Sequence, residues 1–64
     1  MYIKTLHFKE NEIMDFLAFC EAHKDIEYKW NKIKDKQFAY SVHMKYSKER
    51  TNKEIYKMVD RLRK

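Results

Sequence analysis

The sequence predicts a small α+β domain in which two helices cover one face of a three-stranded sheet, in the order β-α-β-β-α. Three observations support this two-layer α/β sandwich: strand-like alternation between residues 38 and 46, helical spacing of apolar residues in two other segments, and a short chain. With 64 residues the chain forms a single domain, 1–64, that buries about 60% of the surface its unfolded form exposes. Its apolar content of 44% supplies a core and excludes a disordered chain.

The first predicted strand spans residues 2–8, where strand-forming residues are dense. Apolar side chains fall on both of its faces, so we expect this strand in the middle of the sheet or beneath a helix. Tyr2, Leu6 and Phe8 share one face, and Ile3 and Thr5 share the other.

A helix is expected next, with Asn11 as its N-cap and with Glu12 and Asp15 in the first turn, where the helix dipole favours acids. His23 and Lys24 close this helix with the charge that a C-terminus prefers. Its apolar stripe consists of Ile13, Phe16, Leu17 and Cys20, flanked by Met14 and Phe19.

Beyond Asp25 the period of the apolar residues changes to two, which predicts an antiparallel hairpin with one buried and one exposed face. Its arms cover residues 26–31 and 38–46, and a loop of about three to five residues near 33–37 joins them. The residues of the second arm that we expect in the core are Phe38, Tyr40, Val42, Met44 and Tyr46. Those that we expect to be exposed are Gln37, Ala39, Ser41, His43 and Lys45.

Thr51 and Glu54 have the spacing of a capping box, which predicts that a second helix begins there and runs nearly to the C-terminus. The apolar stripe of this helix consists of Ile55, Met58, Val59 and Leu62. A right-handed crossover between the first two strands, with the last strand antiparallel between them, gives the sheet order 1-3-2.

The chain lacks the residue patterns of an enzyme. It contains no glycine, so neither a phosphate-binding loop nor a nucleophile elbow forms in its usual way. His7, His23 and His43 do not have the spacing of metal ligands. Cys20 lies inside an apolar stripe, where cysteine behaves as an inert hydrophobe. We therefore expect no catalytic, metal or cofactor site.

The second helix has the charge pattern of a polyanion-binding surface. Lys53, Lys57 and Arg61 recur every four residues opposite its apolar stripe, and Lys64 follows nearby. Like charges at this spacing destabilise a helix by about 0.2–0.5 kcal/mol per pair, and a phosphate backbone would explain them. A solvated outer face explains them equally. The predominance of 12 Lys over 3 Arg weakens the case, because base and phosphate recognition favours Arg.

Aromatic residues point to a protein partner. The one Trp, five Tyr and four Phe exceed what so small a core consumes, so several must lie at its rim, where aromatic side chains anchor interfaces. Tyr56 and Trp30 are the candidates. His43 and Lys45 lie on the open face of the sheet, which a nucleic-acid-binding protein would use together with the second helix. Two open edge strands also allow pairing with another chain, including a homodimer.

Composition also bears on compartment and source. No apolar run approaches the ~20 residues that cross a bilayer, and the first residues lack the order of a secretory signal, so we expect an unprocessed chain with no membrane partner. A single cysteine fits the reducing cytoplasm. Residues with A/T-rich codons make up about half of the chain, which indicates an AT-rich genome, and small reading frames of this kind are common in phages and mobile elements.

The sequence therefore predicts a non-enzymatic cytoplasmic regulator that modulates or inhibits a macromolecule by binding it, with a protein partner favoured. The alternative is a small basic DNA- or RNA-binding protein that uses the second helix.

Overall fold

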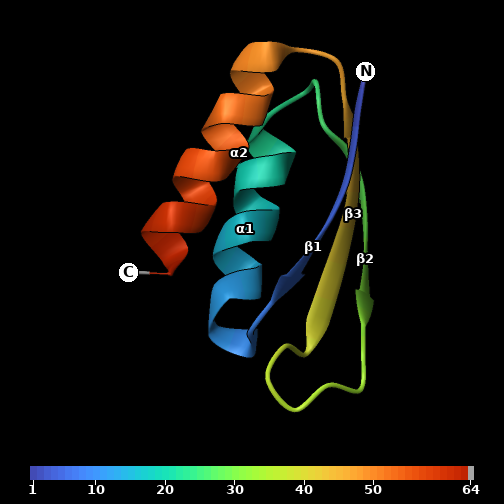
Figure 1. Ribbon diagram of the computed structural model, residues 1–64, viewed down its shortest axis with the longest axis vertical. Helices are drawn as coiled ribbons and strands as arrows, with labels where there is room; N and C mark the ends of the chain where they lie inside the picture. The colour runs from blue at the N-terminus through green and yellow to red at the C-terminus, as the bar shows by residue number, and fades with distance from the viewer. Residues whose placement is uncertain (64) are drawn as a thin grey trace.

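The computed structural model describes residues 1–63 and has two helices on one face of a three-stranded sheet (Figure 1). The predicted fold class and element order are confirmed. The elements are β1 (Tyr2–Phe8), α1 (Glu10–Ala22), β2 (Glu27–Lys32), β3 (Tyr40–Tyr46) and α2 (Glu49–Leu62).

The sheet has the order β1-β3-β2, as predicted, and β3 pairs antiparallel with both neighbours. Of the two places expected for the first strand, the middle of the sheet is wrong, because β3 occupies it and β1 is an edge strand. The place beneath a helix is right, because Phe8 of β1 packs against Phe16 of α1. The apolar side chain on the second face of β1, Ile3, is exposed on the open side of the sheet. Apolar residues on both faces of β1 therefore do not indicate that both faces are buried, because single apolar side chains are often exposed.

The alternation of β3 is confirmed at its C-terminal end, where Val42, Met44 and Tyr46 are buried and His43 and Lys45 are exposed. A shift of one residue would invert this pattern, so the register is strongly specified. At the start of the strand the contrast disappears, because Tyr40 and Ser41 are both half-buried.

The loop between β2 and β3 extends from residue 33 to residue 39, beyond the predicted 33–37. Phe38 and Ala39 therefore lie outside the strand that was expected to contain them. The Asp35 carboxylate accepts hydrogen bonds from the backbone N–H groups of Gln37 and Phe38, at 2.8 and 3.0 Å, and turns the chain before pairing begins. The Ile33 N–H closes the loop by donating to the carbonyl of Ala39 at 2.8 Å.

Both helices begin earlier than the sequence indicated. Lys9, not Asn11, is the N-cap of α1, and the Glu12 carboxylate accepts the Lys9 N–H at 2.8 Å. Lys48 is the N-cap of α2, so Thr51 is not a cap but a buried residue of the first turn. The expected capping box at Thr51 and Glu54 is therefore wrong.

The core lies between the sheet and the helices. The Phe8 ring from β1 stacks on the Phe16 ring from α1, with centroids 4.2 Å apart. Leu17, expected in the apolar stripe of α1, is only half-buried at the edge of this core, and Met14 is 75% exposed. The buried apolar residues are Phe8, Ile13, Phe16, Cys20, Ile26, Val42, Met44, Tyr46, Ile55 and Met58.

Ile55→Ala should destabilise the fold by about 2–5 kcal/mol, because Ile55 is fully buried where α2 meets the sheet and its loss leaves a cavity. Leu17→Ala removes a half-buried side chain of the same size and should cost clearly less. Urea unfolding of both variants compares them, and equal costs would contradict the observed packing.

Candidate functional site

The residues proposed from the sequence lie on several different surfaces. Lys53, Lys57 and Arg61 are exposed on the outer face of α2, whereas His43 and Lys45 lie on the open face of the sheet. Lys64 lies outside the residues that the structure describes. No single site therefore contains all the predicted residues, and the helix layer contains the largest group.

The three cations of α2 form an exposed column. No carboxylate of residues 1–63 lies within 4.0 Å of the side-chain nitrogens of Lys53, Lys57 or Arg61. The Arg61 guanidinium instead approaches the Met58 sulfur, with Nη2 at 2.9 Å. These positive charges are therefore available to another molecule.

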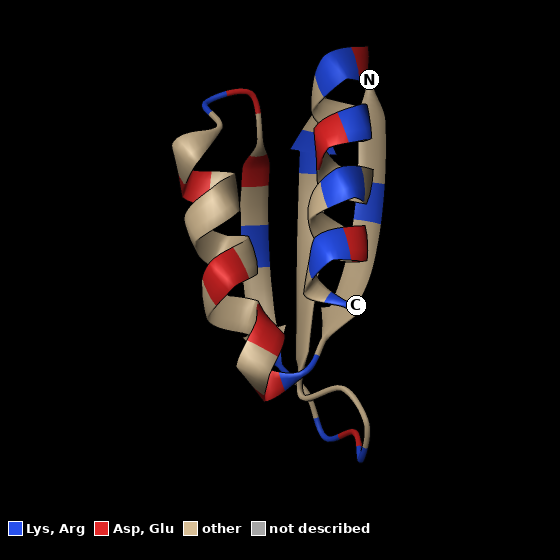
Figure 2. Ribbon diagram, turned by 90° about the vertical axis from the view of Figure 1, so that its left-hand side faces the viewer, with Lys and Arg blue, Asp and Glu red and all other residues tan. Residues whose placement is uncertain are grey.

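Helix α1, which lies beside α2, has the opposite charge. Between Glu10 and Ala22 it carries acidic residues and no Lys or Arg. Figure 2 shows the red segments of α1 next to α2, which has both blue and red segments, on the side of the molecule away from the sheet. The helix layer therefore consists of α1, whose charged residues are all acidic, and α2, which carries the exposed cation column together with Glu49, Glu54 and Asp60. The acidic residues of α1 are Glu10, Glu12, Asp15 and Glu21.

A groove runs between the two helices. It consists of two adjoining depressions of about 360 and 620 Å³, which share Phe19, Met58 and Arg61. We call this feature the interhelical groove. Its remaining lining residues are Asp15, Ala18, His23, Glu54, Lys57 and Leu62.

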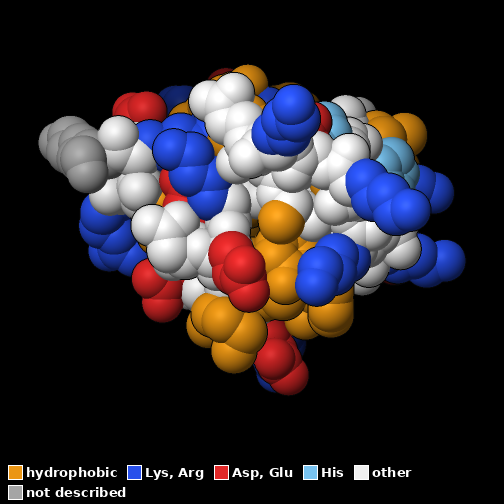
Figure 3. All heavy atoms as spheres, turned by 90° about the horizontal axis from the view of Figure 1, so that it is seen from below, with side chains coloured by type: hydrophobic (Ala, Val, Ile, Leu, Met, Phe, Trp, Pro, Cys, Tyr) orange, Lys and Arg blue, Asp and Glu red, His pale blue; other side chains and the backbone are white. Residues whose placement is uncertain are grey.

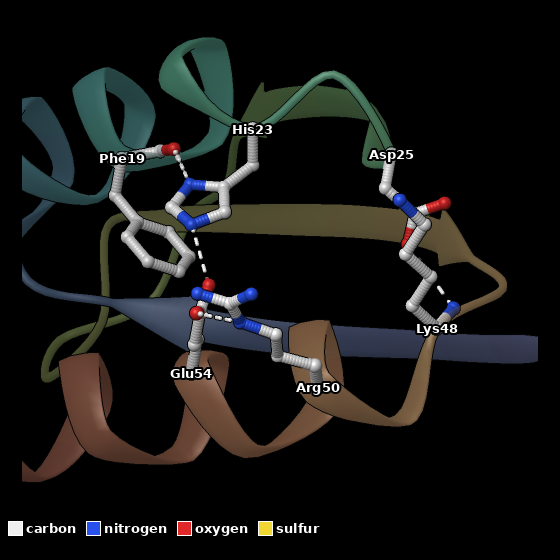
Figure 4. Close-up of polar contacts among 6 residues, drawn as sticks. All are labelled: Phe19, His23, Asp25, Lys48, Arg50 and Glu54. Carbon is white, nitrogen blue, oxygen red and sulfur yellow. Dashed lines mark hydrogen bonds and ion pairs between the residues drawn. The ribbon is translucent and has the colours of Figure 1, made fainter.

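A polar contact joins the helices at one end of the groove. His23, the C-cap of α1, holds its Nε2 atom 2.7 Å from a carboxylate oxygen of Glu54 on α2, and its Nδ1 lies 2.8 Å from the Phe19 carbonyl (Figure 4). The Arg50 Nε atom donates to the other Glu54 oxygen at 3.1 Å. The hydrogen bond with His23, followed by that from Arg50, holds the pKa of Glu54 below its usual value.

A second polar contact joins α1 and α2 near the opposite end of the groove. Arg63, which follows α2, places its Nε atom 3.7 Å from a carboxylate oxygen of Glu12 at the start of α1, and Nη2 donates to the His7 carbonyl at 2.6 Å. Its guanidinium also lies over the rings of Phe8 and Phe38. The two helices are thus joined near both ends.

Asp25 explains why α2 begins a turn before the predicted capping box. Its carboxylate accepts hydrogen bonds from the Ser47 hydroxyl at 2.8 Å and from the backbone N–H groups of Ser47 and Lys48 at 3.3 and 3.1 Å (Figure 4 shows the Lys48 bond). These bonds, the one from the Ser47 hydroxyl first, lower the pKa of Asp25. A residue from another part of the chain therefore holds Ser47 and Lys48, the two residues that precede the first turn of α2.

The exposed aromatic Tyr56 is held by β1. The Lys4 ammonium donates a hydrogen bond to the Tyr56 hydroxyl and lies 3.9 Å from the ring centroid. The Lys4 ammonium and the Tyr46 hydroxyl both donate to Asn52, at 3.4 and 2.6 Å. Tyr56 is 55% exposed, but these contacts give it a structural role as well.

The other predicted aromatic, Trp30, lies at the rim as expected. Its register partner is the buried Val42, so it is on the helix side of the sheet, but it is 49% exposed on the edge strand β2. Its ring packs against Tyr40, with centroids 5.8 Å apart. Figure 3, which views the molecule from below, shows hydrophobic side chains at the surface interspersed with charged ones.

The open face of the sheet forms a separate surface. His43 Nδ1 lies 2.8 Å from the Thr5 hydroxyl across the β1–β3 pair, and Lys45 stands in register with Ile3 and Glu27. A shallow depression of about 390 Å³ lies beside His43 and Lys45. Its mixed charge identifies no particular ligand.

Few of the described residues could support catalysis or hold a metal. Residues 1–63 contain no group of three or more His, Cys, Asp or Glu side chains that could hold a metal ion. Burial raises the pKa of the Cys20 thiol to about 12, so the thiolate required of a nucleophile is scarce at neutral pH.

Sequence reasoning missed the interhelical groove, although it noted its central residue. Phe19 lies beside the apolar stripe of α1, and this off-centre position was the only feature of the sequence that pointed to the groove. Which neighbour such an off-centre residue faces depends on how the helices pack. Ala18 and Met58 gave no signal of their own, because a small exposed residue and an apolar stripe residue are ordinary in a helix.

The chain matches no protein-family model, no curated protein and no solved structure. No helix within residues 1–63 is both long enough and apolar enough to cross a bilayer.

Asp25→Asn should reduce stability at pH 7 and flatten its dependence on acidic pH. Asp25 has a lowered pKa in the folded state, so its contribution is present above its unfolded pKa of about 3.9 and is lost as pH falls through the folded value. Urea midpoints at pH 7 and pH 3 measure both effects. Glu21→Gln makes the same charge change at an exposed site of α1, and it should leave the stability at pH 7 and its dependence on acidic pH largely unchanged.

Cys20 should react with iodoacetamide at pH 8 far more slowly in the folded protein than in 6 M guanidinium, because the thiol is buried and its pKa is about 12. Mass spectrometry of the alkylated chain measures both rates. Equal rates would mean that the thiol is accessible and available for chemistry.

Proposed function

We propose that this chain is a non-enzymatic cytoplasmic regulator that binds another protein and thereby modulates or inhibits it. The observation that carries this proposal is the charge pattern of the helix layer, in which the cationic face of α2 lies directly beside the acidic α1. A nucleic acid presents phosphates over a broad surface and favours a broad basic footprint. A basic strip beside an acidic helix is better matched to a protein surface of mixed charge.

Apolar side chains at the surface also favour a protein. Phe19 and Met58 lie in the interhelical groove, and Trp30 and Met14 are exposed elsewhere on the molecule. Aromatic residues and Met are enriched in protein interfaces. Phosphate contacts would use none of these side chains.

The compartment and the source belong to the same proposal. Cys20, the one cysteine of the sequence, is an unpaired, buried thiol, which fits a reducing cytoplasm. The abundance of residues with A/T-rich codons favours an AT-rich genome and an accessory protein of a phage or mobile element.

A small DNA- or RNA-binding protein is the second candidate. The observation that favours it is the spacing of Lys53, Lys57 and Arg61, which places three exposed cations on one face of α2. A phosphate backbone along this helix would remove the mutual repulsion of these cations.

Fluorescence anisotropy with labelled duplex and single-stranded oligonucleotides distinguishes the two functions. We expect only weak, salt-sensitive binding that does not depend on base sequence, with a Kd above ~1 μM at ~0.15 M salt. If α2 binds phosphates, alanine at position 53, 57 or 61 should each lower the log–log salt slope by about one. Lys29→Ala, on the open face of the sheet, is the matched control.

A Kd below ~1 μM for any oligonucleotide at this salt concentration would overturn the protein-binding proposal in favour of the second candidate. A photocrosslinker at position 57, used in nuclease-treated cell lysate, should join the chain to another protein. The same crosslinker at position 29 should not.

A further inference from the structure

We propose that the interhelical groove binds an acidic amphipathic helix of the partner protein. This inference rests on the proposed function and identifies the chemistry of the partner segment. It uses three properties of the groove: an apolar floor, a cationic wall on one side, and a length fixed by the contacts that join α1 and α2.

The floor provides sites for apolar anchors. Phe19 and Leu62 are half-buried; Phe19 and Met58 line both depressions of the groove, and Leu62 lines one. Met side chains adapt their shape to a ligand. Ala18 lines the α1 side, and its small side chain lets another backbone approach closely.

The cationic wall explains the charge of the ligand. Lys57 and Arg61 line the α2 side of the groove and are four residues apart, so they lie on the same face of the helix. Carboxylates four residues apart on a bound helix have the same spacing and can meet both cations. Glu54, the acid on this wall, is already engaged by His23 and Arg50, at 2.7 and 3.1 Å. Asp15, at the open end, is the other acid in the lining.

The length of the groove suits a short helix. On α1 its lining runs from Asp15 to His23, which corresponds to about 12 Å, or roughly two turns. The His23–Glu54 contact joins the helices at one end, and the Arg63–Glu12 contact joins them near the other. A groove held open in this way is preorganised, which reduces the cost of ordering it on binding.

A second copy of the chain is a poorer match. Its acidic α1 has suitable charge, but the exposed face of that helix presents one large apolar side chain, Met14, with the small Ala18 one turn later. An interface generally depends on several large anchors in desolvated pockets. A partner helix with two or three large apolar side chains and acidic residues beside them would contact both the apolar floor and the cations Lys57 and Arg61.

The test uses the full-length protein and a fluorescein-labelled synthetic helix with Leu at positions i, i+4 and i+7 and Glu beside them. We expect saturable binding that weakens about tenfold when the Glu residues are replaced by Gln, or when Lys57→Glu and Arg61→Glu are combined. Lys53→Glu is the matched control for Lys57→Glu alone, since both reverse one charge on α2, and position 53 lies outside the groove lining, so Lys53→Glu should change binding less than twofold.

Ala18→Gln should also weaken the peptide, because it fills an exposed position in the groove without touching the core. Amide chemical-shift mapping should place the changes within residues 15–23 and 54–62. Circular dichroism confirms that each variant is folded before its affinity is compared.

Three outcomes would overturn the groove proposal. Lys53→Glu could weaken the peptide as much as Lys57→Glu, which would indicate general charge attraction. The shifts could map to the open face of the sheet. Sedimentation could reveal a dimer that Lys57→Glu dissociates, which would make the occupant a second copy. Each of these leaves nucleic-acid affinity weak, whereas failure of the proposed function itself appears as tight oligonucleotide binding.

Discussion

The fold depends on the position of β3 between β1 and β2. Every strand pair in the sheet includes β3, so neither edge strand is paired without it. The same strand supplies Val42, Met44 and Tyr46, all buried, to the surface on which the helices pack. One short alternating segment thus provides both the hydrogen-bonding centre of the sheet and much of the core beneath the helices.

The helices are oriented by polar contacts that reach across the chain. Asp25 from the α1–β2 connection satisfies the start of α2, His23 contacts Glu54, and Arg63 contacts Glu12. In a domain this small the core alone gives limited stability, so such contacts have a large share in fixing the geometry. They also leave the middle of the helix pair open, and the interhelical groove lies in that opening.

The sequence was informative wherever one local pattern decided the outcome. The alternation of β3 was sufficient for the buried face, and the periodicities of the five segments were sufficient for the element order. The right-handed crossover rule then gave the sheet order. The start of α1 was missed because its N-cap is Lys9, which is not a usual N-cap residue, although Glu12 accepts the Lys9 N–H from position N3. The start of α2 was missed because its contact with Asp25 comes from a distant part of the sequence. Only part of the candidate site could be predicted from the sequence. The spacing of Lys and Arg residues predicts the cations of α2. The groove beside them is formed by Phe19 and Met58 from two different helices, and their proximity depends on the tertiary packing.

The sheet order also has a consequence for how the chain acquires its structure. The β2–β3 hairpin joins neighbours in sequence, whereas the β1–β3 pair joins Tyr2 to Tyr46 and closes most of the chain into a loop. Loop-closure entropy makes the distant pairing the slower step, so we expect the hairpin to form first and β1 to add to it afterwards. Until β1 adds, the edge of β3 that it covers has unpaired backbone N–H and C=O groups, which another chain could pair with.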